Sequence, residues 1–197
     1  MPVGFTLVEL LVVISIIAIL ASLGLPAIAR TRDKGQSSKC VSNLKSLHTA
    51  SILFAQDYNG LLPMGKTNAT SPDFNDQWHR NILPYIKEGS EASNFATLKL
   101  KTFLCPSDKT PYGSGTLSYS MNALLGEKRL ANLANTVIFI GDSTNSYKLS
   151  PATAGDQSLP RHGKLRNVIF SDGHVEALEK LPSYATNKAL WDPSYSP

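Results

Sequence analysis

The chain contains one apolar segment that is long enough to cross a lipid bilayer. It runs from Leu10 to Ala29 without an ionisable side chain, and Glu9 directly precedes it. A bilayer core of about 30 Å needs roughly 20 apolar residues at a helical rise of about 1.5 Å each. A carboxylate at that depth costs several kcal/mol unless it is paired or protonated. Glu9 therefore marks a functional position; the alternative is an ordinary signal anchor with an incidental acid near its end.

The residues around Glu9 resemble a known processing site. The string GFTLVE at residues 4–9 is similar to the N-terminal cleavage and methylation motif of type IV prepilins and type II secretion pseudopilins. The resemblance implies that a prepilin peptidase cuts after Gly4 and that the new amine of Phe5 is methylated. It also implies that Glu9 guides assembly, and Pro26 stands where these proteins usually have a helix-kinking proline.

This resemblance divides the chain into three parts. Residues 1–4 form a leader, residues 5–29 a transmembrane and assembly helix, and residues 30–197 a head outside the cytoplasm. In a filament, Glu9 of one subunit is expected to meet the Phe5 ammonium of its neighbour. Either charge alone in apolar surroundings would cost more than the pair, so the pair would set the axial register.

The head has the size of one domain and a mild positive charge. About 165 of the 197 residues lie outside the apolar segment, which leaves room for a single core. All 19 lysines and arginines follow the segment, and they are scattered along the chain. A nucleic-acid surface needs a basic stripe or stacked aromatic positions, so no nucleic-acid partner is expected.

Helical periodicity continues beyond the apolar segment. Small or apolar residues recur at three- and four-residue steps from Cys40 to Tyr58, while Gln36, Lys39, Asn43, Lys45 and Ser46 fill the other faces. Asn59-Gly60 predicts the end of the helix. A short helix is expected over 78–86, disturbed by Pro84.

Strands are predicted late in the chain, over 116–122, 136–140, 167–171 and 174–178. Asp172-Gly173 between the last two predicts a type I′ hairpin. A long helix followed by hairpin-connected strands indicates an α+β fold with an antiparallel sheet packed on the helix. This is the shape of a type IV pilin-like protein.

Further sequence blocks resemble a large bacterial group of prepilin-like proteins. The blocks are Cys40-x2-Asn43-Leu44-Lys45, Asp57-Tyr58-Asn59-Gly60-x2-Pro63, Cys105-Pro106-Ser107-Asp108 and Ser118-Tyr119-x-Met121-Asn122, and the C-terminal hallmark is His162-x9-Asp172-Gly173. Members of this group resemble the major pseudopilin of type II secretion.

The resemblance implies a structural subunit of a type II secretion filament. Its partners would be other pseudopilins, the prepilin peptidase and, indirectly, a secretion ATPase and an inner-membrane platform. The subunit would span the inner membrane once, with its head in the periplasm. The alternatives are a major or minor pilin of a type IV pilus for adhesion or DNA uptake, and an anchored binding module that never polymerises.

The residues of the C-terminal hallmark have two interpretations. His162, Asp172 and His174 could form a divalent-metal site or a hydrogen-bonded switch near the hairpin. Alternatively, Asp172 and Gly173 serve turn geometry while His162 bonds to the returning strand. Related major pseudopilins bind calcium through loop acids, but calcium needs six or more oxygen ligands. The candidate acids here are scattered and form no recognisable acidic loop: Asp108, Asp142, Asp156 and Asp172. No cofactor is therefore expected.

Cys40 and Cys105 are the two cysteines of the chain. Both belong to the part expected outside the cytoplasm, where an oxidising compartment favours a disulfide. Two buried free thiols are the alternative, and the spacing does not decide between them.

An enzyme is the rival class of function. His48, His79, His162 and His174 could be combined with many polar residues, but the sequence contains no serine-hydrolase elbow, zinc-protease helix, Cys-x2-Cys pair or phosphate loop. The chain is therefore expected not to be an enzyme.

Overall fold

The computed structural model of the chain describes residues 6–63, 78–86, 100–109, 117–133, 136–143, 148–149 and 160–194, without the side chains of residues 23–27 and 29. Gly4 and Phe5 of the processing motif lie outside these residues, as does Asp156.

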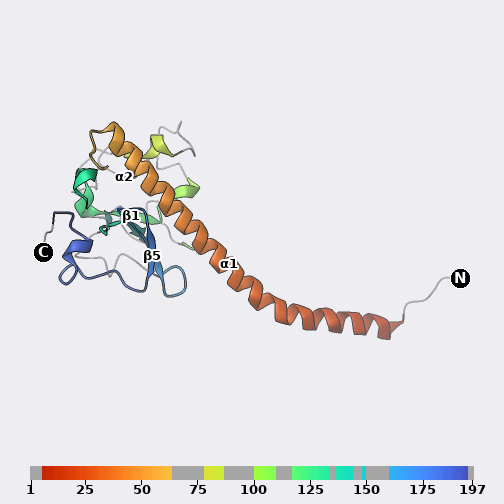
Figure 1. Cartoon of the computed structure of the whole chain (residues 1–197). Coiled ribbons are helices and arrows are strands. Elements are labelled where there is room, and N and C mark those ends of the chain that lie inside the picture. Colours follow the sequence, from red (N-terminus) through yellow and green to blue (C-terminus); the bar gives the residue numbers. More distant parts are fainter. Residues whose placement is uncertain are drawn as a thin grey trace.

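A single long helix, α1 (Leu7–Asp57), dominates the architecture (Figure 1). It ends where the sequence predicts: Asn59 and Gly60 take left-handed backbone conformations with φ of 52° and 78°. The Gly60 N–H then donates to the carbonyl of Ala55 and satisfies the end of the helix.

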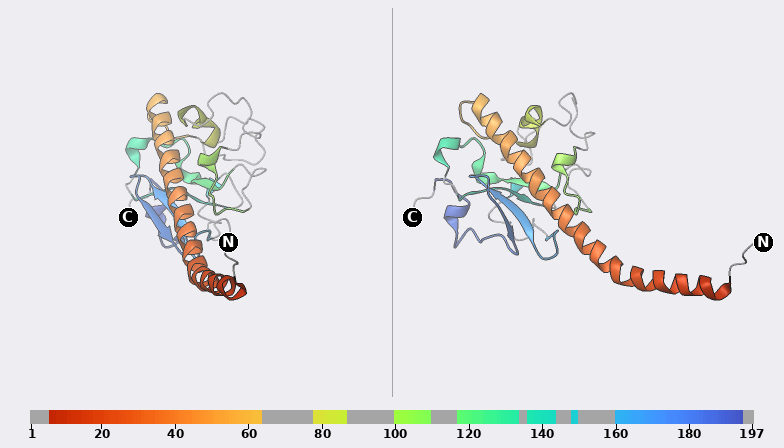
Figure 2. Two further views of the ribbon diagram at one scale, coloured as in Figure 1. Left: turned by 90° about the vertical axis from the view of Figure 1, so that its right-hand side faces the viewer. Right: turned by 45° about the vertical axis from the view of Figure 1, so that its right-hand side comes forward.

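The N-terminal half of α1 extends away from the head, and the ribbon bends between the two halves (Figures 1 and 2). Its large apolar side chains from Leu7 to Leu20 are 47–79% exposed. The hydroxyls of Ser15 and Ser22 donate back to the carbonyls of Leu11 and Ile19, so they do not interrupt this apolar surface. Within the described residues, no helix offers an apolar stretch long enough to cross a membrane.

The C-terminal half of α1 packs on the head. The buried stripe follows the predicted spacing and comprises Cys40, Leu44, Leu47, Ala50, Ser51, Phe54 and Ala55. Asn43 corrects the prediction, because it is 2% exposed and does not lie on an outer face. Its amide donates to the carbonyls of Lys101 and Leu104, which explains how a polar side chain is buried in the helix contact.

The head contains a five-stranded sheet in the order β3-β1-β2-β4-β5. The strands are β1 (Tyr119–Asn122), β2 (Ile138–Asp142), β3 (Lys148–Leu149), β4 (Arg166–Phe170) and β5 (Val175–Leu178). Four strands pair antiparallel, which confirms the predicted α+β fold. The two-residue β3 was not predicted, and it pairs parallel to β1 at one edge.

Short helical segments complete the head: α2 (Trp78–Asn81), η2 (Leu83–Tyr85), η4 (Lys101–Phe103), η5 (Ala123–Leu125), η6 (Leu130–Asn132) and η7 (Lys188–Leu190). The helix expected over 78–86 is therefore broken in two near Pro84, with Trp78 and Ile82 fully buried.

Both faces of the sheet are covered. Phe139 and Ile169 pack in the core beneath α1, while Ile138 and Val168 point to the opposite face and pack around Trp191. The amide of Asn122 donates to the carbonyls of Ile138 and Trp191, which holds the C-terminal segment against the sheet.

The hairpin between β4 and β5 differs from the predicted type I′ turn. Type I′ needs positive φ at both central residues, but of Asp172 and Gly173 only Gly173 has a positive φ, 86°. The Gly173 N–H donates to the Phe170 carbonyl, and the Phe170 N–H donates to the His174 carbonyl. This pattern is that of a three-residue loop with a left-handed glycine in a bulge.

The same hairpin contacts α1 through His48. The Nε2 atom of His48 donates to the carbonyl of Ser171 at 3.1 Å, and its ring lies edge-on to Phe139. A Cβ atom on Gly173 would lie 3.5 Å from the His48 ring. The hairpin is thus fitted closely to the helix.

A disulfide between Cys40 and Cys105 joins α1 to the loop that follows η4. Both residues are buried, and Cys40 is the first fully buried position along the described part of α1. The disulfide therefore sits where the helix enters the head.

We expect the variant His48→Gln to make the stability of the protein less dependent on pH. Burial lowers the pKa of His48 below 6.5, although the Ser171 carbonyl and Asp172 oppose this shift. The unfolded state therefore binds more protons below about pH 6.5, so His48's contribution is complete above that pH and is lost as the pH falls. A glutamine amide can still donate to Ser171 but does not titrate. Urea unfolding at neutral and mildly acidic pH measures the difference, with His174→Gln as the exposed control. Equal pH dependence in His48→Gln and the unaltered protein would contradict this account.

We expect loss of the disulfide to lower the free energy of unfolding by about 4 kcal/mol in the chain-entropy model. The reason is that the bond closes a loop with a sequence separation of 65 residues. Urea unfolding of the oxidised protein, the reduced protein and the double variant Cys40→Ala/Cys105→Ala gives the value. Reduction and the double substitution should lower the free energy of unfolding by the same amount, apart from the cost of the cavity that alanine leaves. Unchanged stability on reduction would show that the bond does not constrain the unfolded chain.

Candidate functional site

The N-terminus of α1 places Glu9 in a capping box. The Glu9 carboxylate accepts hydrogen bonds from the Thr6 N–H at 2.9 Å and from the Thr6 hydroxyl at 2.7 Å. The Glu9 N–H in turn donates to the Thr6 hydroxyl. The predicted assembly acid thus caps its own helix in the single chain, at an exposed position where a second molecule can reach it.

A buried charge cluster lies at the other candidate site, where α1 meets the sheet. The Arg161 guanidinium lies 2.7 Å from Asp108 and 3.7 Å from Asp142, and all three side chains are at most 4% exposed. Arg161 also donates to the carbonyls of Ser118 and Ser143. One arginine therefore ties the loop after Cys105 to strands β1 and β2.

The Asp142 carboxyl is fully buried within this cluster. Burial raises its pKa to about 6, although the Asn167 N–H at 2.7 Å and the Arg161 charge oppose that rise. Its carboxylate is therefore ionised at neutral pH only with the help of these partners. Removing one partner of a buried ion pair typically destabilises a protein by about 3–5 kcal/mol, so loss of Arg161 is expected to destabilise the head by a similar amount.

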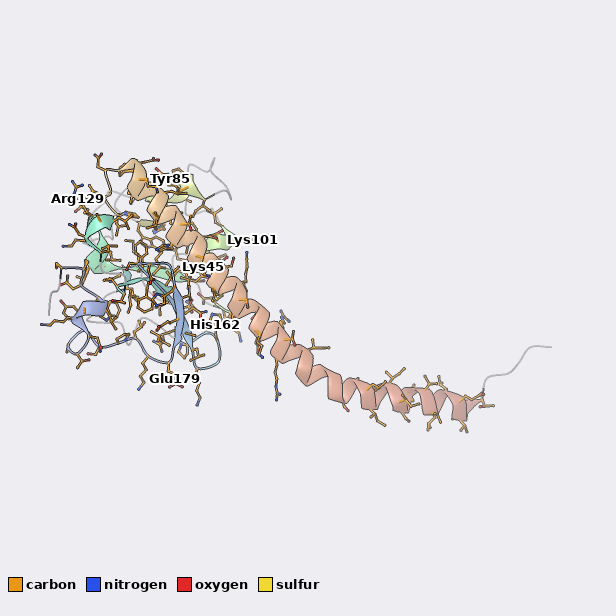
Figure 3. The ribbon with its side chains drawn as sticks, in the orientation of Figure 1. Lys45, Tyr85, Lys101, Arg129, His162 and Glu179 are labelled. Atoms are coloured by element: carbon orange, nitrogen blue, oxygen red, sulfur yellow. A yellow bond between two sulfur atoms is a disulfide. The ribbon has the colours of Figure 1, made fainter. Side chains whose placement is uncertain are left out.

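His162, labelled in Figure 3, borders the same cluster and lies close to the disulfide. Its Nε2 atom lies 3.6 Å from Cys105 Sγ and 3.6 Å from Asp142 Oδ2, and its Nδ1 atom lies 3.5 Å from the Ser107 hydroxyl. Burial, and secondarily the charge of Arg161, lower the pKa of His162, so the ring is neutral at neutral pH. The structure also places its backbone N–H on the Leu165 carbonyl, just before β4.

Ser107, His162 and Asp142 are the residue types of a hydrolase triad. A nucleophile and its base usually lie about 2.6–3.2 Å apart, but Ser107 and His162 are 3.5 Å apart. The Ser107 hydroxyl instead donates to Gln36 at 3.2 Å. The arrangement is therefore better explained as part of the packing around the disulfide than as a catalytic triad.

The structure separates His162 from the other two residues of the predicted metal site. His162 precedes β4, whereas Asp172 and His174 flank Gly173 in the hairpin at the opposite end of this strand. His174 Nδ1 and Asp172 Oδ1 are 2.5 Å apart in a direct hydrogen bond, and both side chains are exposed. The His174 N–H also donates to Asp172 and lowers the pKa of that carboxyl. Turn geometry accounts for Asp172 and Gly173.

The candidate calcium acids are separated in the same way. Asp108 and Asp142 both face Arg161, while Asp172 caps the distant hairpin. Asp156 lies outside the described residues. The three described acids therefore do not converge on one point.

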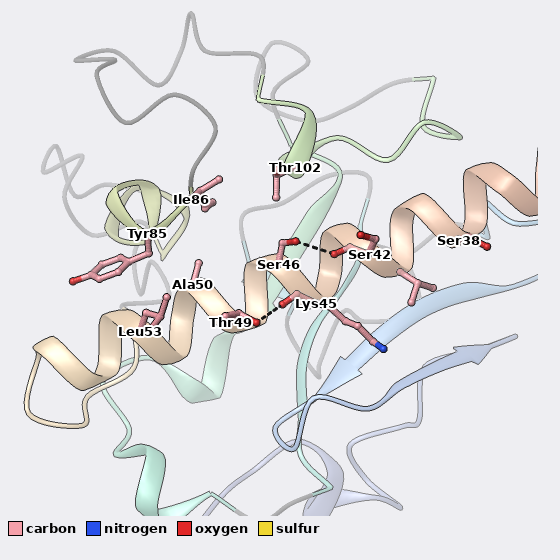
Figure 4. A pocket seen from close by; sticks show the side chains of 11 residues that line it. Ser38, Ser42, Lys45, Ser46, Thr49, Ala50, Leu53, Tyr85, Ile86 and Thr102 are labelled. Carbon is pink, nitrogen blue, oxygen red and sulfur yellow. Dashed lines mark hydrogen bonds between the residues drawn. The ribbon is translucent and has the colours of Figure 1, made fainter.

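Two grooves run along α1. One, of about 750 Å³, is basic and ends at His162; its charged and histidine lining residues are Arg30, Arg32, Asp33, Lys34, Lys109, Arg161 and His162. The other, of about 670 Å³, lies between α1 and η2 and carries hydroxyl groups (Figure 4). Ser46 and Thr49 line it, but they donate back to the carbonyls of Ser42 and Lys45.

The sequence analysis assigned no role to Arg161, and it named His48 only among the histidines of a possible enzyme. It named Asp108 and His162 as block members and candidate metal ligands but not as neighbours of one arginine, which stands directly before His162 in the sequence. A charged residue beside the hallmark histidine was the available signal. His48 gave no local signal, because its partner Ser171 is distant in the sequence.

Comparison with known proteins identifies relatives of this chain. Residues 4–25 match the family described as the prokaryotic N-terminal methylation motif. No solved structure matches the chain significantly. The chain is similar to the type IV major fimbrial protein FimA of Dichelobacter nodosus, with 33% identity over 160 residues that cover 80% of this chain and 92% of the relative.

Two further relatives show the range of the family. The type IV major alpha-pilin of Moraxella bovis is 32% identical over 139 residues, which cover 68% of this chain and 76% of the relative. The type II secretion system core protein G of Pectobacterium carotovorum subsp. carotovorum is 41% identical over 56 residues, or 28% of this chain and 36% of the relative. The chain therefore belongs to the family of type IV pilins and type II secretion pseudopilins.

Proposed function

We propose that this protein is a pseudopilin that assembles into the helical filament of a type II secretion system. The observation that carries the proposal is the exposed apolar half of α1. An apolar surface of this extent normally marks a site covered by a membrane or by other proteins. Packing the helices of many subunits side by side would cover it and leave the heads outside.

The proposal includes a membrane stage before assembly. After cleavage at Gly4, the segment from Phe5 to Ala29 anchors the subunit in the inner membrane, with the head in the periplasm. The prepilin peptidase processes it, and an ATPase with a membrane platform moves it into the filament. The work of the protein is structural and not catalytic, in keeping with relatives that are named pilins and secretion core proteins.

A type IV pilus is the second candidate machine. A fimbrial protein and an alpha-pilin align with 80% and 68% of this chain, whereas the secretion relative aligns with 28% of it. Filament assembly is common to both candidates. Deleting the gene and measuring secretion, adhesion and pilus formation distinguishes them; an unchanged secretion profile with lost pili would favour the pilus.

We expect the protein recovered from membranes to lack Met1–Gly4 and to carry one methyl group on Phe5. Intact-mass measurement tests both changes at once. The variant Gly4→Val should remain uncut, because a bulky side chain replaces the glycine before the cut, and Gly35→Val is the control in the middle of the same helix. An uncut, unmethylated chain in the unaltered protein would refute the processing step.

We expect Glu9→Gln to reduce filament incorporation at least about tenfold, because it leaves the Phe5 ammonium of a neighbour without its counter-charge. Glutamine also serves in a capping box, so this variant keeps the helix cap. Thr6→Ala is the matched control, since it removes the capping hydroxyl and keeps the carboxylate. Filament yield after shearing measures the result. If Glu9→Gln assembled normally while Thr6→Ala failed, Glu9 would act as a helix cap and not as an assembly charge.

A further inference from the structure

The disulfide and His162 form a compact group of potential metal ligands. The sulfur atoms of Cys40 and Cys105 and a ring nitrogen of His162 all lie within 4.8 Å of one another. Cys40 comes from α1, Cys105 from the loop after η4, and His162 from the segment before β4. Two thiolates and an imidazole from three elements are a common ligand set for zinc.

The spacing of His162 fits a tetrahedral ion. With Zn–S of about 2.3 Å and Zn–N of about 2.05 Å, a sulfur and a nitrogen on one zinc lie about 3.6 Å apart. The distance between Cys105 Sγ and His162 Nε2 is 3.6 Å. The distance between Nε2 and Cys105 Sγ therefore already equals the distance expected between two ligand atoms of one tetrahedral zinc ion.

Asp142 is the candidate fourth ligand; it lies beside His162 but outside the 4.8 Å group, so its side chain must shift toward the sulfurs to bind the same ion. Its Oδ2 atom lies 3.6 Å from His162 Nε2, close to the edge of about 3.4 Å expected between a nitrogen and an oxygen on zinc. The Asn167 N–H donates to this oxygen and orients it. Arg161 faces the other oxygen and compensates the negative charge of the ligands.

The surroundings of His162 also suit a metal ligand. A zinc-bound histidine usually donates its second ring N–H to a neighbouring group, which fixes its orientation. With Nε2 on the metal, Nδ1 carries the proton, and the Ser107 hydroxyl lies 3.5 Å from it. His162 and Ser107 line the groove beside α1, so this side of the site reaches solvent, although the basic residues of the groove disfavour the approach of a cation.

We propose that the reduced protein binds one Zn²⁺ through Cys40 Sγ, Cys105 Sγ, His162 Nε2 and a carboxylate oxygen of Asp142. The disulfide and the zinc site are mutually exclusive, because the two sulfurs must part from covalent distance to about 3.8 Å on one zinc. In a newly made chain the two cysteines are still reduced thiols, so they can bind zinc without a reduction step. In the oxidised chain, a phosphine and water break the S–S bond to give two thiols and the phosphine oxide, and Zn²⁺ then displaces the two thiol protons.

Zinc would join the two elements that the disulfide connects, α1 and the loop after η4, and would add the segment before β4. A chain whose thiols are still reduced could thereby keep α1 fixed to the head until oxidation replaces the metal with a covalent bond. This inference does not depend on which machine the filament serves.

The test uses the full-length protein in detergent. The protein is reduced with a phosphine, freed of metal with a chelator and incubated with Zn²⁺, and bound zinc is measured by elemental analysis. One zinc per reduced chain, and less than a tenth of that in the oxidised chain, is the expected result. His162→Gln should weaken binding at least about tenfold, whereas His174→Gln, in the exposed hairpin, should leave it unchanged.

Two measurements guard against a variant that fails to fold. Circular dichroism checks each variant, and X-ray absorption of the zinc-loaded, unaltered protein counts its ligands directly, with two sulfurs and two nitrogen or oxygen atoms expected. No zinc in the reduced protein, a different sulfur count, or equal affinity in folded His162→Gln would overturn the proposal.

Discussion

The packing of one stripe of α1 against the sheet is the contact on which the rest of the structure depends. The helix is continuous, yet its two halves have opposite surroundings. From Cys40 onward, one stripe of apolar side chains is buried on the head, whereas the large apolar side chains from Leu7 to Leu20 are exposed. In a soluble monomer such a surface would be costly, since each buried CH₂ contributes about 0.8 kcal/mol. The head therefore stabilises the second half of the helix and leaves the first half available to lipid or to other subunits.

The hallmark residues of the head work at two separate places. His162 and Asp108 belong to the junction of α1 with the sheet, together with Arg161 and the disulfide. Gly173 belongs to the far hairpin, where its left-handed backbone completes the turn beside the ring of His48. Strand β4 connects the two places, and each end of the strand is thereby fixed to the helix side of the head. The nine residues between His162 and Asp172 thus span strand β4 and the turns at its two ends.

Local patterns in the sequence predicted where helices and strands lie better than they predicted which residues contact one another. Asn59-Gly60 located the end of α1, because a left-handed pair stops a helix wherever it occurs. Asp172-Gly173 located the hairpin but not its type, which depends on the register of the strands. Asn43 was misplaced since its polarity suggested solvent, while two carbonyls of a distant loop satisfy it in the interior. Two features depend on contacts between residues that are distant in the sequence: the cluster of Asp108, Arg161 and Asp142, and the edge strand β3. The periodicity of a single sequence does not predict such contacts.

The position of the disulfide has a mechanical consequence. In any assembly that moves by pulling or pushing on helices, force enters each head along α1. Cys40 is the first fully buried residue that this force meets along the described helix, and its partner Cys105 lies in a loop that Asp108 anchors to Arg161. The load therefore passes into the sheet through a covalent bond and a buried ion pair before it reaches the apolar contacts farther along the helix. A disulfide and a buried ion pair thus stand between the pulled end of α1 and the apolar contacts of the head.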